Sequence, residues 1–192
     1  MGLLVLGLVI FLGAHSTRIF ADDWRTRQIA RIGAMPWKGL YSVVSIVGFA
    51  LIVWGYGRAR NLPGLLWQSP EWMRPVTAAL MLVSFVLLTA AYVPRNGIRA
   101  RLHHPMLLGV KTWAFAHLLV NGSDADVLLF GAFLVWAVVC FRSARVRDRA
   151  AHTVYAPGTA RGTAVAVIVG IVAWAVFGFW LHGLLIGVKP VA

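Results

Sequence analysis

HHPMLLGVKTWAFAHLLVNG, residues 103–122, is the stretch that decides how this chain folds. An apolar segment starts there at Pro105, a residue that the first turn of a helix tolerates well, and it ends at the polar residues Asn121 and Gly122. Lys111 and His117 lie inside the segment. Ionisable side chains are costly in lipid, so in a membrane span both become candidate functional residues.

The composition indicates a membrane protein. Of the 192 residues, 60% are hydrophobic and only 12% are charged, and that charged share is about half of what a soluble domain carries. The net charge of +12 fits arginine-rich loops between membrane spans better than a nucleic-acid-binding surface, so no nucleic-acid partner is expected. The single cysteine, Cys140, permits no intramolecular disulfide.

Six apolar stretches approach the length needed to cross about 30 Å of hydrocarbon. They are residues 3–20, 40–56, 76–93, 105–120, 127–141 and 163–186. Backbone groups in lipid need partners within the chain, and the alternation of a barrel strand is absent, so these spans are expected to be helices. The predicted fold is an all-α, polytopic transmembrane bundle of about six helices, forming a single domain over residues 1–192.

The basic residues predict the orientation in the membrane. Thirteen of the 18 Lys and Arg residues lie in the first, third and fifth loops: Arg18, Arg25, Arg27, Arg31, Lys38, Arg95, Arg99, Arg101, Arg142, Arg145, Arg147, Arg149 and Arg161. Only Arg58, Arg60, Arg74 and Lys189 lie in the other loops and the C-terminus. Because cytoplasmic loops carry the excess of positive charge, both termini are expected to be periplasmic, in a bacterial inner membrane.

His117 is the first candidate ligand of a metal. It lies about twelve residues into the fourth span, with Trp113 and Asn121 one turn away on the same helix face. A histidine there can ligate a metal through one ring nitrogen while the other nitrogen is held by a neighbouring group. A buried histidine that hydrogen-bonds between helices is the alternative, and the residues alone leave both interpretations open.

His15 is the second candidate, in the segment AHSTRIF of the first span. Arg18 follows one turn later, which suits a haem, because the imidazole can ligate iron and the guanidinium can pair with a propionate. A polar residue at a helix end near the membrane interface is the alternative.

Four further residues have open roles. Lys111 either extends toward the headgroups or pairs with a propionate or another anion. His104 lies seven residues before Lys111, so the two share a helix face and are candidates to line one polar pocket. His103 is expected to be an interfacial residue at the helix start. Trp113, one of several tryptophans within spans, either packs plainly or walls a flat cofactor.

Several of these segments together resemble the NnrU family of bacterial membrane proteins. They are residues 103–122, LLFGAFLVWAV at 128–138, AHSTRIF at 14–20, and RIGAMPWKGLYSVVSIVGFALIVWGYGRA at 31–59. The core of this resemblance covers about residues 1–142, and the last transmembrane helix, at about 163–186, is less distinctive.

The resemblance implies a link to denitrification, in nitrite and nitric oxide reduction. The NnrU family is also similar to the plastid 15-cis-zeta-carotene isomerase, a membrane haem b protein with histidine ligands. The WCLAH segment of that enzyme matches WAFAH at residues 113–117, which implies that His117 is a ligand, and its earlier HSG histidine matches His15. The isomerase's cysteine, an exchangeable ligand, corresponds to Ala114.

The resulting hypothesis is an inner-membrane protein that binds one haem b through His15 and His117. Arg18, Lys111, Trp113 and Asn121 would surround the cofactor, with Arg101 as another cation for a propionate. The role would be in denitrification or in redox-dependent isomerisation of a lipid-like polyene, with a lipophilic or nitric-oxide-type ligand. A homo-oligomer or a redox partner stays open as a further partner.

Two alternatives belong to other classes. A membrane methyltransferase or reductase-like enzyme would use the His104 and Pro105 element, which is similar to the HP-x-x-x-G element of isoprenylcysteine methyltransferases. An assembly factor without a cofactor is the other.

Overall fold

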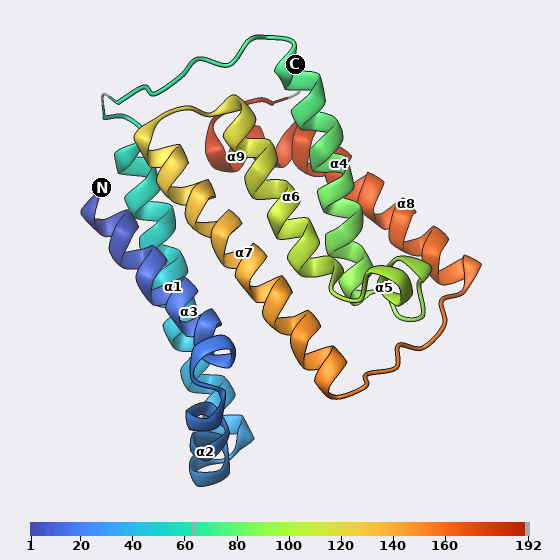
Figure 1. The fold of residues 1–192 in the computed structure, drawn as a ribbon. Helices are drawn as coiled ribbons and strands as arrows, with labels where there is room; N and C mark the ends of the chain where they lie inside the picture. Colours follow the sequence, from blue (N-terminus) through green and yellow to red (C-terminus); the bar gives the residue numbers. More distant parts are fainter. Residues whose placement is uncertain (63, 191–192) are drawn as a thin grey trace. The chain divides into compact units, whose positions relative to one another are not determined.

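The structure is a computed structural model that describes residues 1–62 and 64–190, and over these ranges it contains helices and no strand (Figure 1). Within the described ranges, five helices are long and apolar enough to cross a membrane: Gly2–Phe20, Ala34–Ala59, Met73–Tyr92, Asp124–Ala150 and Ala160–Ile186. A shorter apolar helix is Pro105–Val120. The predicted all-α transmembrane fold is confirmed, and each of the six predicted apolar stretches coincides with a helix.

The first of two compact units comprises Met1–Trp67 and Gly122–Trp136. Its elements are α1 (Gly2–Phe20), α2 (Asp22–Ile32), α3 (Ala34–Ala59) and the first half of α7 (Asp124–Ala150).

Glycines bring α1 and α3 together as an antiparallel pair. A Cβ atom at Gly7 would lie 2.6 Å from the backbone nitrogen of Ile52, and one at Gly48 would lie 2.8 Å from that of Phe11. Gly55, nearer the end of α3, has the same close approach to the start of α1. Close backbone contact between small residues is a common way for helices to associate in lipid, because the hydrophobic effect does not drive helix association there.

A buried carboxylate joins α3 to the start of α7. The Tyr56 hydroxyl donates to Oδ1 of Asp126 over 2.6 Å. Oδ2 of Asp126 accepts from the backbone nitrogen of Ser123 at 3.0 Å and from its hydroxyl at 2.6 Å. The charge of Asp126 therefore lies at the positive end of its own helix, with its acceptors satisfied.

The second compact unit comprises Gln68–Asn121 and Ala137–Ala192. Its elements are α4 (Met73–Tyr92), α5 (Gly97–Leu102), α6 (Pro105–Val120), the second half of α7, α8 (Ala160–Val176), the π-helical turn η1 (Phe177–Leu181) and α9 (His182–Ile186).

Helix α4 is the centre of this second unit. The Ser84 hydroxyl donates to the Gly109 carbonyl of α6 over 2.8 Å, and the Thr89 hydroxyl donates to the Ala166 carbonyl of α8 over 2.8 Å. Ser84 is fully buried. Both neighbours run antiparallel to α4. Helix α4 is tied to α6 by Ser84 and to α8 by Thr89.

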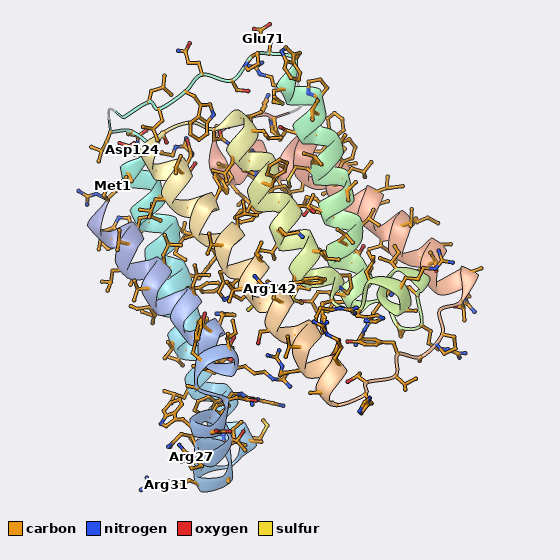
Figure 2. All side chains as sticks on the ribbon, viewed as in Figure 1. Met1, Arg27, Arg31, Glu71, Asp124 and Arg142 are labelled. Carbon is orange, nitrogen blue, oxygen red and sulfur yellow. The ribbon has the colours of Figure 1, made fainter. Side chains whose placement is uncertain are left out.

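Two arginine-rich segments that were expected to be loops are largely helical. Helix α2 occupies most of the first one; Asp22 and Asp23 lie in its first turn, and Arg31 lies in its last turn, which suits the helix dipole. Arg27 and Arg31 project from this helix (Figure 2). Helix α7 continues to Ala150, nine residues beyond the predicted apolar end at 141. The added turns are rich in arginine and alanine, which are both strong helix formers.

Two glycines of α3 test the α1–α3 contact. Gly55→Ala should destabilise the protein by about 1–3 kcal/mol, because the new methyl group meets the Leu4 backbone. Gly57→Ala is the matched control, since nothing lies within 4 Å of a Cβ there. Thermal unfolding in detergent, followed by circular dichroism, should show a lower midpoint for Gly55→Ala only. Equal midpoints would show that α1 and α3 do not pack through these glycines.

Candidate functional site

His15 lies in the last third of α1 and is held by its own helix. Its Nδ1 atom lies 2.7 Å from the carbonyl oxygen of Phe11, one turn earlier. A carbonyl only accepts hydrogen bonds, so Nδ1 carries a ring proton, and in the neutral imidazole the lone pair is then on Nε2. That tautomer is the one in which Nε2 can ligate a metal while a backbone group orients the ring.

Aromatic rings of the first unit surround the His15 imidazole. The ring centroids of Phe11, Tyr41 and Trp136 lie 4.2, 5.2 and 6.1 Å from that of His15. Phe133 lies 5.8 Å from Phe11 and extends the cluster onto α7. Rings from α1, α3 and α7 therefore form an apolar environment around a single half-buried imidazole.

Two buried polar atoms of the first unit have no hydrogen-bond partner among the described residues. They are the indole Nε1 of Trp136 and the hydroxyl of Ser45. Trp136 meets the His15 ring edge-on, and Ser45 lies one turn after Tyr41 on α3. Buried donors are rarely left unpaired, so this part of the unit is suited to a ligand that brings acceptor atoms.

Arg18, expected to pair with a propionate, lies in the last turn of α1 and is exposed. It follows His15 by almost one turn, so both residues belong to the same end of the helix. A cation at a helix C-terminus is also favoured by the helix dipole.

His117 repeats the arrangement of His15 on α6. Its Nδ1 atom lies 2.9 Å from the carbonyl oxygen of Trp113, one turn earlier, so Nδ1 again carries a proton, and in the neutral ring the lone pair is on Nε2. The Trp113 ring is tilted against the imidazole at a centroid distance of 5.4 Å. His117 is half-buried.

Asn121 is the C-terminal capping residue of α6 and follows His117 by one helical turn. Its side-chain amide donates to the carbonyl oxygen of His117 over 2.9 Å, and its backbone nitrogen lies 2.9 Å from the same oxygen. Asn121 was expected to share the face of His117 near a cofactor, and in the structure its amide contacts the backbone of that residue. Ala114, at the position of the isomerase's cysteine, is fully buried.

Comparison of the sequence with models of known protein families identifies the family of this chain. A family model described as NnrU protein matches residues 3–190. The chain belongs to the NnrU family. No curated protein and no solved structure matches it. The sequence segments that resemble the family end at about residue 142. The family model matches beyond that point and includes α8, η1 and α9.

Lys111 and His104 of this NnrU protein both lie against Phe141, and His104 also has an acidic partner. The Lys111 ammonium lies 5.6 Å from the centroid of the Phe141 ring, a cation–π distance. Nε2 of His104 lies 2.7 Å from Oδ2 of Asp148. The His104 ring also meets the Phe141 ring edge-on at 6.2 Å, so both side chains pack against Phe141.

Sequence reasoning missed a polar cluster in the second unit of this NnrU protein. The Tyr155 hydroxyl donates to the same oxygen of Asp148 over 2.8 Å, and the Tyr155 ring stacks on His103 at 4.1 Å. Arg145 contacts Nδ1 of His103. Asp148 is the only acidic residue after 126, and that isolation among arginines is the signal that could have identified the cluster.

The cluster joins the start of α6 to the end of α7 and to the segment that follows. His103 has a φ of +69°, a backbone conformation that is uncommon for residues other than glycine. Stacking on Tyr155 and the contact with Arg145 hold it there. Burial, and then the hydrogen bond to Asp148, raise the pKa of Tyr155 to about 12.

Among the described residues, no group of three or more His, Cys, Asp and Glu side chains could hold a metal ion.

The raised pKa of Tyr155 makes stability depend on pH. Because the folded chain holds the phenol proton more tightly than the unfolded chain, this stabilisation is complete below the unfolded pKa of about 10 and is lost as the pH rises from 10 toward 12. The thermal midpoint of the wild type should therefore fall more steeply over this range than that of Tyr155→Phe. Parallel pH profiles would contradict the hydrogen bond to Asp148.

Proposed function

We propose that this NnrU protein is an inner-membrane protein that binds one haem b, with His15 and His117 as the axial ligands. The observation that carries the proposal is the shared state of the two imidazoles. In both, Nδ1 donates to the carbonyl oxygen one turn earlier, at 2.7 and 2.9 Å, which leaves the lone pair of Nε2 for iron.

The surroundings of His15 support haem over a bare metal ion. Flat aromatic side chains, those of Phe11, Tyr41 and Trp136, suit the faces of a macrocycle. The buried indole nitrogen of Trp136 would donate to a propionate oxygen, and Arg18 would neutralise a propionate at the end of α1. On the side of His117, Lys111 would pair with a propionate and Trp113 would pack against the face of the macrocycle.

A bound haem b would supply an iron that alternates between the ferrous and ferric states. Imidazoles from His15 and His117 would together leave no open coordination position on the iron. Electron transfer or sensing would therefore be favoured over oxygen chemistry. Because the resemblance to the NnrU family implies a link to denitrification, we propose a role beside nitrite and nitric oxide reduction. The protein would lie in the inner membrane, with the arginine-rich first, third and fifth loops in the cytoplasm. A polyene isomerase that exchanges a cysteine ligand is less well supported, because Ala114 offers only a methyl group.

Haem content tests the ligands directly. Protein purified from haem-replete cells should give a pyridine haemochrome of b type with one haem per chain. His15→Ala and His117→Ala should each lose most of it. His182→Ala is the matched control, because its Nδ1 also lies on a backbone carbonyl, that of Val188, yet it has no proposed role. Colourless wild-type protein, or unchanged spectra in both ligand variants, would refute the assignment.

Trp136→Phe tests the propionate partner. It keeps an aromatic ring beside His15 but removes the indole N–H, so haem affinity should fall about tenfold, the usual effect of losing one hydrogen bond to a charged group. Trp174→Phe, on α8, is the control for loss of a tryptophan within a span. Titration of the apoprotein with haemin measures both. Equal affinities for the wild type and Trp136→Phe would remove Trp136 from the site.

A further inference from the structure

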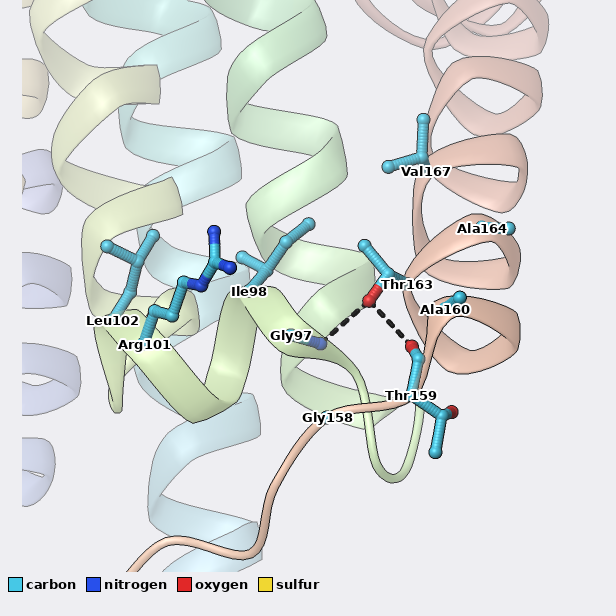
Figure 3. Close-up of a pocket in the computed structure, with 10 residues that line it drawn as sticks. All are labelled: Gly97, Ile98, Arg101, Leu102, Gly158, Thr159, Ala160, Thr163, Ala164 and Val167. Carbon is cyan, nitrogen blue, oxygen red and sulfur yellow. Dashed lines mark hydrogen bonds between the residues drawn. The ribbon is translucent and has the colours of Figure 1, made fainter.

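An open pocket of about 780 Å³ lies between α5 and the start of α8, within the second unit (Figure 3). From α8 it is lined by Ala160, Ala164 and Val167, which recur at helical spacing and form one face. From α5 it is lined by Ile98, Arg101 and Leu102. The lining is thus apolar, with one guanidinium.

The other polar groups at this pocket are already satisfied within the chain. The Thr163 hydroxyl donates to the Thr159 carbonyl over 2.8 Å and accepts from the backbone nitrogen of Gly97 over 2.8 Å (Figure 3). The Thr159 hydroxyl donates to the Arg95 carbonyl. A ligand therefore finds a single charged donor, Arg101, beside an apolar surface.

The surrounding charge is strongly positive. Helix α5, the end of α7 and the start of α8 carry several arginines, whereas the one carboxylate in this region, Asp148, bonds to His104 and Tyr155. No ion pair joins Asp148 to an arginine in the described part of the second unit. Asp148 thus leaves the positive charge of this region uncompensated, and the pocket would favour an anion with an apolar tail.

We propose that this pocket binds an anionic phospholipid of the surrounding bilayer. The phosphate lies against Arg101, and one acyl chain follows Ile98, Ala164 and Val167. Basic pockets between membrane helices are known to suit such headgroups, and a guanidinium pairs well with phosphate oxygens. The exposed apolar side chain of Ile168, one turn after Ala164 on α8, continues the apolar surface of the pocket. The haem proposal above uses Arg18 and Lys111 for the propionates, so assigning Arg101 to a phospholipid does not depend on whether the protein binds haem.

A free phosphate ion fits the pocket less well. One exposed guanidinium gives a small anion little to bind in water, since surface ion pairs contribute little. A phospholipid adds the burial of its acyl chain against the apolar lining, which a free phosphate cannot do. The proposal therefore commits to a lipid as the occupant.

Helix α5 contains a matched pair of arginines for the test. Arg101 lines the pocket, whereas Arg99 lies outside it and donates to the Ala91 carbonyl at 3.4 Å. Both are exposed, and Arg101→Gln and Arg99→Gln change the net charge equally. Val167→Phe fills the apolar part of the pocket, and Val165→Phe is its control, because Val165 lies on α8 but does not line the pocket.

The experiment measures lipid retention by native mass spectrometry of the full chain in detergent. The protein is mixed with equal concentrations of phosphatidylglycerol and phosphatidylcholine. Wild-type protein should retain phosphatidylglycerol preferentially. Arg101→Gln should lower that retention about fivefold, the effect of one cation near a phosphate, and Val167→Phe should lower retention of the same lipid. Arg99→Gln and Val165→Phe should match the wild type.

Three outcomes would overturn the proposal. Equal loss in Arg99→Gln and Arg101→Gln would show that diffuse surface charge, and not the pocket, attracts the lipid. Equal retention of both lipids by the wild type would show that Arg101 does not select an anion. Displacement of phosphatidylglycerol by inorganic phosphate at millimolar concentration would show a phosphate site in place of a lipid site. Circular dichroism of each variant confirms that a loss is not one of folding.

Discussion

Lipid offers no hydrogen-bond partners, and the structure of this NnrU protein depends on that constraint. Each polar group within a span has to find its partner inside the chain. The backbone meets the constraint by forming helices, and Ser84 and Thr89 meet it by donating to carbonyls of neighbouring helices. For an imidazole on a helix, the nearest acceptor is the carbonyl one turn earlier. That bond fixes the tautomer of His15 and of His117, and so decides which nitrogen is left for chemistry.

The sequence predicted the helices well but not where they end. Apolar length follows from the thickness of the bilayer, so all six apolar stretches could be found. The length of an apolar stretch does not show whether its helix continues beyond the bilayer into water. Helix α7 extends to Ala150 through a run of arginines, and α2 fills a segment that was expected to be a loop. Helix α5 begins with an Asn96 cap, whose side chain accepts from the backbone of Arg99, a local signal that hydropathy does not weigh.

The candidate site was predictable to the extent that its residues are unusual in their surroundings. His15 and His117 were identifiable because each is the only histidine in an apolar helix. Asn121 was harder, because a shared helix face does not reveal that α6 ends at that residue, where the amide caps the backbone of His117. The pairing of His104 with Asp148 was missed because the partners are 44 residues apart and only the packing of α6 against the end of α7 brings them together.

The central claim is that two neutral imidazoles, each oriented by its own helix, hold one haem iron. Electron paramagnetic resonance of the oxidised, purified full chain tests it most directly, because the spin state of ferric iron reports its axial ligands. Two imidazoles predict a low-spin ferric signal that disappears in His15→Ala and in His117→Ala. A high-spin signal from the wild type, or no haem signal at all, would contradict the account.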